Sequence, residues 1–371
     1  MSDLSEHHDE LRRIARGLLG ASSNRPLDWA QVAEVGWLGL EVPEALNGAG
    51  ATFAETAVVL EEMGRAATTS PYLGSAVLGV GALQAVLPDP DLDDLLRALA
   101  AGERRVAVGL APTGDQATVE PPFRVERTAD GLRLTGRAQF VVDGTEADEL
   151  IVLAVDPDGE LVLVCVDATA VGVIDQPVLD ATRRFATVTA SGTSLSPSSV
   201  RSFAGDAATA AQHVLDRGAV AVACDSLGLG AAMLDATVTY VADRQQFGRA
   251  IGSFQAVKHQ CADMLVQLTV GRELLDVAVE ALSQPAGGPG PAAARAASFL
   301  SAAAVDVVGA AMQLHGGVGY SWESGIHVYL KRATLNRSLF GSPAAQRRRL
   351  SDELVGAPAS LPGRAGGLRR G

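Results

Sequence analysis

The alternation of hydrophobic and polar residues predicts helices in the first part of the chain. Apolar residues recur at helical spacing near the N-terminus, at Leu4, Leu11, Ile14, Leu18 and Leu19. The stretches 29–40, 54–63, 76–87 and 91–100 have the same period, which indicates amphipathic helices that bury one face. Residues 1–104 are therefore expected to form an N-terminal helical domain.

The pattern changes between residues 105 and 203. Short apolar, β-branched runs cover 106–110, 123–127, 140–142, 150–153 and 161–165, and Asp-Gly turns stand between several of them, at 130–131, 143–144 and 158–159. Closely spaced strands without intervening helices are typical of an antiparallel barrel or sandwich. A β domain over 105–203 is the expectation.

Helical spacing returns at about residue 204. Long periodic stretches cover 207–244 and 254–282, a Gly/Pro-rich loop follows at 285–291, and a further helix is expected over 292–314. These helices predict a C-terminal bundle over 204–357. The Gly/Arg/Pro-rich residues 358–371 are expected to form a flexible tail.

Composition and charge narrow the function classes. The chain has 371 residues, enough for two or three domains, and its net charge of −13 argues against a nucleic-acid partner, which requires a basic face. Cys165, Cys224 and Cys261 are scattered and predict buried thiols, without a disulfide frame or a metal site. We find neither a signal peptide nor an uninterrupted apolar run of membrane-spanning length, so a cytoplasmic protein without a membrane span is expected.

Two segments carry more specific information. Residues 244–264 read RQQFGRAIGSFQAVKHQCADM, and residues 313–323 read QLHGGVGYSWE. The first places an arginine at a helix end, followed by a Phe-Gly turn and an amphipathic helix, which an ordinary helix connection would also explain. The second places glycines after a long helix, where they could bring the backbone close to a ligand or simply cap the helix.

Taken together and in this order, the two segments closely resemble the signatures of the acyl-CoA dehydrogenase family. The resemblance extends over nearly the whole chain and includes residues 36–43, 60–65 and 140–154. It implies a mostly α fold with a central antiparallel β domain: an N-terminal helical domain, a β-barrel and a C-terminal four-helix bundle. It also implies an enzyme that uses FAD to desaturate an acyl-CoA thioester between its α and β carbons.

The resemblance further implies that each flavin lies between two subunits. One subunit holds the isoalloxazine ring and the acyl chain, and its neighbour holds the diphosphate and adenine end. The residues of this chain that match the neighbour-facing positions are Arg244, Phe247, Gln255, Gln313, Gly316 and Gly317. Their chemistry suits the task, because arginine matches a diphosphate, amides supply hydrogen bonds, and glycine lets the backbone approach closely.

The positions that would serve this chain's own flavin have lost their chemistry. The family's catalytic glutamate lies 27 residues after the motif glutamine, which is Phe340 here, and an alternative base position 22 residues before Tyr240 is Gly218. Neither residue can accept a proton. The Trp-Ile-Thr segment that contacts flavin N5 in the family is replaced by Phe140-Val141-Val142, so the threonine hydroxyl is missing too.

Other residues could substitute for the base or contact the coenzyme. Asp216 lies two residues from Gly218, but an acid early in a helix is also favoured by the helix dipole. Glu323 stands where relatives carry a structural acid. The arginines at 347–349 and 183–184 could contact a CoA phosphate or lie on solvated surfaces.

Three hypotheses follow. The first is a base-deficient subunit of a mixed acyl-CoA dehydrogenase, resembling one chain of the paired actinobacterial enzymes of steroid side-chain degradation, with a homologous subunit as partner in a heterotetramer. The second is a self-sufficient homo-oligomeric dehydrogenase with a relocated base such as Asp216. The third is a non-catalytic acyl-CoA-binding protein. An electron-transfer flavoprotein is the electron acceptor that the resemblance implies for an enzyme.

Overall fold

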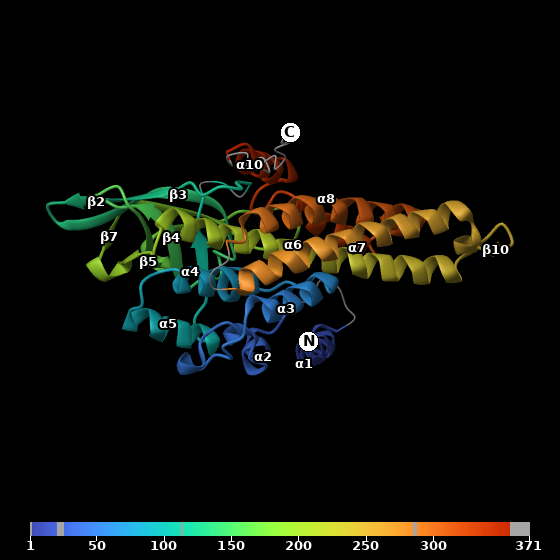
Figure 1. Ribbon diagram of the computed structural model, residues 1–371, viewed down its shortest axis with the longest axis horizontal. Coiled ribbons are helices and arrows are strands. Elements are labelled where there is room, and N and C mark those ends of the chain that lie inside the picture. Colours follow the sequence, from blue (N-terminus) through green and yellow to red (C-terminus); the bar gives the residue numbers. More distant parts are fainter. Residues whose placement is uncertain (1, 21–25, 112, 114, 285–287, 357–371) are drawn as a thin grey trace, which may run out of the picture.

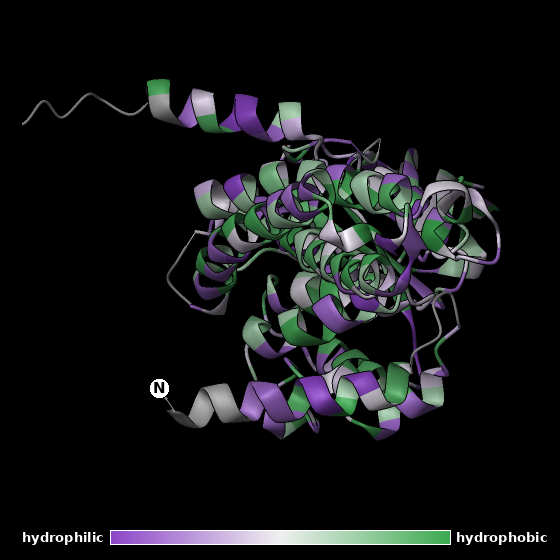
Figure 2. Cartoon of the chain, turned by 90° about the vertical axis from the view of Figure 1, so that its right-hand side faces the viewer, coloured by the Kyte–Doolittle hydropathy of each residue, from purple (hydrophilic) through white to green (hydrophobic). Residues whose placement is uncertain are grey.

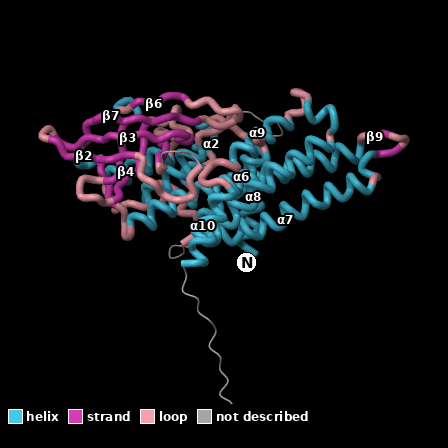
Figure 3. The backbone as a smooth tube through the Cα atoms, turned by 90° about the horizontal axis from the view of Figure 1, so that it is seen from above, coloured by secondary structure: helices cyan, strands magenta, loops and turns pink. Residues whose placement is uncertain are grey.

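The computed structural model describes residues 2–20, 26–111, 113, 115–284 and 288–356, with helices, a sheet and helices again in chain order (Figure 1). The predicted tail from residue 358 lies outside the described residues. Figure 3 shows the strands of the large sheet gathered at one end of the molecule, the long helices extending away from them, and the short strand β9 (Gln245–Gln246) at the far end.

The N-terminal region is helical. Its elements are α1 (Ser2–Leu19), α2 (Trp29–Glu34), α3 (Phe53–Arg65), a π-helix (Leu73–Gly79) that continues into α4 (Val80–Gln84), and α5 (Pro90–Ala100), with short 3₁₀ turns at Trp37–Gly39 and Glu44–Leu46. A capping box of Thr52 and Glu55 begins α3, and Asp89 caps α5. The π-helix begins before the helix predicted over 76–87. There Gly74 N–H donates to Asp143 (2.8 Å) and the Val77 carbonyl accepts from Arg217 Nε (2.8 Å).

The β domain is one 8-stranded sheet. Its strands are β1 (Val106–Gly109), β2 (Phe123–Thr128), β3 (Gly131–Val142), β4 (Glu149–Val155), β5 (Leu161–Asp167), β6 (Gly172–Asp175), β7 (Phe185–Leu195) and β8 (Val200–Ser202), in the order β6-β7-β3-β2-β4-β5-β8, with β1 also on β4. Most pairs are antiparallel, but β1 and β2 both run parallel to β4. The expected fold class of helices around a central β domain is confirmed, but the sheet is mixed and not antiparallel throughout, because these two ladders are parallel. The chain leaves the sheet after β1 and rejoins the same edge of β4 in the same direction.

The C-terminal region is a helical bundle. It contains α6 (Ala207–Asp243), a hairpin of β9 (Gln245–Gln246) and β10 (Arg249–Ala250), α7 (Gln255–Ser283), α8 (Gly290–Leu314), α9 (Ile326–Asn336) and α10 (Pro343–Gly356). Figure 2 shows apolar residues concentrated inside the bundle, and many hydrophilic residues on α1 and α10 outside it. By length and composition α6 and α8 could cross a membrane, but 72% and 50% of their apolar windows are buried, so both are core helices of this bundle.

A buried ionic cluster joins the three regions. Asp225 on α6 accepts hydrogen bonds from Arg332 on α9 (Nε to Oδ2, 3.0 Å) and from Asn336 (2.7 Å), and it pairs with Arg183 just before β7 (3.2 Å). Arg332 also donates to the carbonyl of Thr68 in the N-terminal region (2.6 Å). The two arginines lower the pKa of Asp225 although burial alone would raise it. Arg183 is therefore buried in an ion pair, whereas Arg184 is exposed.

Asp143 provides a second link between the N-terminal region and the sheet. It follows β3 with a positive φ of 59° and is buried, and its carboxyl group accepts the hydrogen bond from Gly74 N–H. Burial raises its pKa to about 7, against the smaller opposing effects of that hydrogen bond and of Arg183. The group therefore binds a proton that an exposed aspartate would have released at the same pH.

Candidate active site and cofactor-binding surface

The two expected base positions lie in direct contact. Gly218 is on α6, and Phe340 is in the loop between α9 and α10. A Cβ atom added to Gly218 would lie 2.8 Å from Cε1 of the Phe340 ring, so the ring occupies the space that a side chain at 218 would need. The two positions, 122 residues apart in the numbering, converge on one point, and neither carries a carboxylate.

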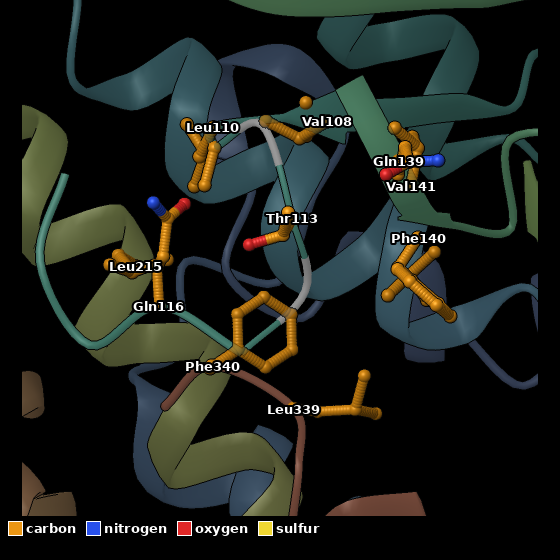
Figure 4. Close-up of a pocket in the computed structure, with 13 residues that line it drawn as sticks. Val108, Leu110, Thr113, Gln116, Gln139, Phe140, Val141, Leu215, Leu339 and Phe340 are labelled. Atoms are coloured by element: carbon orange, nitrogen blue, oxygen red, sulfur yellow. The ribbon is translucent and has the colours of Figure 1, made fainter. Parts of the chain in front are cut away.

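The Phe340 ring points into a pocket between α6 and the sheet, as Figure 4 shows. The walls come mainly from β1 and the residues after it, from the end of β3 and from Leu215 on α6, and they are largely apolar with Thr113, Gln116 and Gln139 among them. The free volume inside is about 30 Å³, room for one or two water molecules.

A β-bulge shapes the sheet side of this pocket. The β3–β7 register shifts between Ala138 and Val141, and Phe140 within the shift has a positive φ of 53°. Its N–H donates to Gln176 Oε1 (2.9 Å), and its ring contacts the edge of Phe185 at 6.1 Å. Bulges commonly re-aim side chains beside functional sites. Val142, at the position of the family's threonine, is buried and has no hydroxyl group to offer.

Asp216 lies beside the pocket but is held in a salt bridge. Its side chain is 1% exposed and pairs through both carboxylate oxygens with Arg349 on α10, the Nη2–Oδ2 distance being 2.8 Å. Gln212 also donates to it (2.9 Å). Burial disfavours the charge on Arg349, but the hydrogen bond and charge of Asp216 outweigh this effect and raise the pKa of Arg349. Asp216 is not among the residues that line the pocket.

The remaining weak candidates lie on the surface. Glu323 is exposed, and hydrogen bonds from its own backbone and from Ser321 lower its pKa. Arg347 and Arg348 are exposed on α10, unlike Arg349. None of these side chains lines the Phe340 pocket.

The first sequence motif forms a hairpin at the end of the bundle away from the sheet (Figure 1). Arg244 follows the last residue of α6 and is exposed. Phe247 and Gly248 form the tip with positive φ values of 52° and 76°, as a type I′ turn requires. The Phe247 side chain is 90% exposed. Gln255, also exposed, is the first residue of α7.

The second motif meets this end of α6. The Tyr240 ring stacks on His315 at 4.3 Å, and Tyr240, Arg244 and His315 line one open hollow. Gln313, Gly316 and Gly317 flank His315 and are exposed. A Cβ atom added to either glycine would meet no atom within 4 Å, so their backbone is accessible to a ligand. The exposed guanidinium group, amides and glycine backbone fit the diphosphate end of a dinucleotide such as FAD.

The pocket and the hairpin end are far apart within one chain. Gly218 and Asp243 both lie on α6, and at about 1.5 Å per residue they are roughly 40 Å apart along its axis. One dinucleotide does not bridge that distance. Arg244 and Phe340 of the same chain therefore cannot contact the same cofactor.

Several residues that shape the pocket carry no clear sequence signal. Gln176 binds the Phe140 backbone, and Gln346 donates to the Phe340 carbonyl (2.7 Å). Gln346 and Arg349 are three residues apart, a spacing that places both on one helix face. The sequence shows this spacing, but it does not show that this face of α10 contacts Phe340 and Asp216.

Comparisons with known proteins identify the family of the chain. The family models "Acyl-CoA dehydrogenase, N-terminal domain" and "Acyl-CoA dehydrogenase, C-terminal domain" match residues 6–103 and 207–355. The acyl-CoA dehydrogenase IpdE2 of Mycolicibacterium smegmatis is 32% identical, with 95% of each chain covered.

Two similar solved structures are mixed assemblies by their names. A chain of the ChsE4–ChsE5 complex from Mycobacterium tuberculosis is 25% identical with a TM-score of 0.83, covering 96% of this chain and 98% of that one. A chain of a Tcur3481–Tcur3483 steroid ACAD variant is 28% identical with a TM-score of 0.80, covering 95% and 98%. The chain therefore belongs to the acyl-CoA dehydrogenase family, the FAD-binding oxidoreductases that act on CH–CH bonds.

Proposed function

We propose that this chain is the base-deficient subunit of a mixed acyl-CoA dehydrogenase and that it completes FAD sites whose base belongs to a homologous partner. The observation that carries the proposal is the division of the chain into two ends. At one end an aromatic ring and a glycine meet at the two positions where the family resemblance would put a base, and at the other the six residues that it assigns to the cofactor are all exposed.

The exposed hairpin supports a partner at that end. The Phe247 side chain at the turn tip is 90% exposed. Its apolar surface is removed from water only when another molecule covers it. Arg244 would bind the flavin diphosphate, while Gln255 and Gln313 would donate hydrogen bonds to the same cofactor. Bound FAD supplies the acceptor for the hydride from the β carbon, and the partner's carboxylate would take the α proton.

The similarity to a steroid ACAD suggests the substrate class. We infer a CoA thioester with a steroid-derived acyl group, an electron-transfer flavoprotein as acceptor, and a cytoplasmic location. A self-sufficient enzyme that uses Asp216 gains no support from the geometry, since both oxygens of that carboxylate bind Arg349. A non-catalytic acyl-CoA-binding protein would have no need for the intact cofactor-facing set.

Arg244→Ala tests the shared site directly. The chain would be co-expressed with a homologous dehydrogenase chain that carries the glutamate base, and FAD affinity would be measured by fluorescence titration of the apo complex. Charge-assisted hydrogen bonds contribute about 1.5–3 kcal/mol, so we expect FAD to bind roughly 10 to 100 times more weakly.

The matched control is Arg347→Ala, which removes an exposed arginine from α10 and should leave FAD affinity unchanged. Equal FAD affinity in the Arg244→Ala and unaltered complexes would contradict the proposal.

A further inference from the structure

We propose that Phe340 determines specificity by exclusion: its ring closes this chain's own pocket to acyl thioesters, so that a mixed complex binds them only in its partner's pockets. The inference rests on the proposed function and adds a steric property to it. Loss of the base alone would leave a cavity in which a thioester could bind without reacting. A filled cavity removes that unproductive binding.

The fit between Phe340 and Gly218 carries the inference. Cε1, Cδ1 and Cζ of the ring would lie 2.8, 2.9 and 3.0 Å from a Cβ atom at residue 218, so the ring lies flat against the α6 backbone. Leu215 of α6, Phe140 of the bulge and Leu110 after β1 complete the surrounding wall. About 30 Å³ remains free, whereas pockets that hold drug-sized ligands have roughly 300–1,000 Å³.

Buried polar contacts from α10 keep the ring in place. Phe340 has a positive φ of 52°, a backbone conformation that non-glycine residues adopt only where their surroundings impose it. Gln346, 1% exposed, donates to the Phe340 carbonyl at 2.7 Å. At Gly341, with φ of 97°, an added Cβ atom would lie 2.6 Å from Cβ of Ala117, so the loop has no room to shift toward that segment.

The segment that packs against this loop, residues 117–119, is held by hydrogen bonds as well. Gln212 on α6 donates to the Ala117 carbonyl (3.0 Å) and accepts from Val119 N–H (3.0 Å), and it also binds Asp216, the partner of Arg349. The salt bridge from α10 to α6 and the bond to Phe340 thus belong to one connected set of contacts. Opening the pocket would require these buried groups to lose their partners together.

The number of ligands bound by the mixed complex tests the inference. The probe is S-octyl-CoA, a thioether that resembles an acyl-CoA but cannot be desaturated through an enolate, and its binding is counted by isothermal titration calorimetry and native mass spectrometry. We expect Phe340→Ala to bind one more probe molecule for each copy of this chain than the unaltered complex does. An equal count, or a probe already present in this chain's pocket without the substitution, would overturn the inference.

Two further variants keep the result interpretable. Phe123→Ala removes a buried ring from the core cluster of the sheet, against which Phe340 does not pack, so it reproduces the loss of packing and should add no probe molecule. Phe340→Leu, which preserves more of the packing, provides a folded variant if Phe340→Ala does not assemble, and it should also increase the count. Flavin affinity is measured in the same samples: an unchanged probe count with normal flavin binding rejects only this inference, whereas failure of the Arg244 test rejects the shared site.

Discussion

Asp225→Asn is expected to destabilise the folded chain by about 3–5 kcal/mol, because it removes the only carboxylate shown to pair with both Arg332 and Arg183 in the described structure. Both arginines are buried, so neither can recover its hydration when the negative charge disappears. The effect is measured by urea denaturation, from the shift of the midpoint at constant slope.

The same helix offers a matched control. Asp235 is also on α6 and pairs with Arg65 at 2.6 Å, but its side chain is 67% exposed. Asp235→Asn should cost no more than about 1 kcal/mol, as is usual for surface ion pairs. Equal costs for the two substitutions would mean that the buried cluster does not hold the three regions together.

Asp143→Asn is expected to change how stability depends on pH. The pKa of Asp143 is raised from 3.8 to about 7 by burial, so between these values the folded chain holds a proton that the unfolded chain has released. The contribution of Asp143 to the free energy of unfolding is therefore fully present below about pH 4. It is lost as the pH rises toward 7, with a slope of about 1.4 kcal/mol per pH unit. Asparagine can still accept from Gly74 N–H but has no proton to release, so it should remove this slope.

The prediction is checked by urea denaturation of both proteins at pH 4, 5.5, 7 and 8. The free energy of unfolding of Asp143→Asn relative to the wild type should increase with pH and level off above 7. Asp130→Asn, in an exposed Asp-Gly turn, controls for the change of residue type and should show a constant difference. A constant difference for Asp143→Asn as well would contradict the raised pKa.

Periodicity was sufficient to predict the long elements. The helix expected over 207–244 is observed as Ala207–Asp243, and the one expected over 254–282 as Gln255–Ser283. These helices are long, and their apolar positions pack against neighbouring elements. The hydrophobic periodicity is therefore a stronger signal than the conformational preference of any single residue. The π-helix at Leu73–Gly79 was not predicted, because the Asp143 and Arg217 side chains that bind its backbone are distant in sequence.

Strand direction was also beyond the sequence pattern. Short β-branched runs indicate that a segment is extended, but not which neighbour it pairs with. β1 and β2 both pair with β4. Both ladders are parallel because residues 110–122, which connect β1 to β2, return the chain to β4 in the same direction. That path depends on tertiary packing around the pocket, which includes Gln116 and Phe340.

The candidate site shows the same division between local and long-range information. Motif spacing located Phe340 and Gly218 as positions that lack a base, and the structure places them against each other. Motif spacing could not reveal that the Asp216 carboxylate pairs with Arg349, because the two residues are 133 positions apart in the sequence. The roles of Arg244, Phe247, Gln255, Gln313, Gly316 and Gly317 toward FAD stay a prediction.

The flavin content of a purified mixed complex tests the central claim most directly. Native mass spectrometry would count the chains, and the absorbance of released FAD would count the cofactor in the same sample. Because we propose that the chain completes only its partner's sites, the complex should contain one FAD for each pair of unlike chains. The chain expressed alone should contain no FAD. One FAD for every chain, or a yellow homo-oligomer that desaturates an acyl-CoA without a partner, would contradict it.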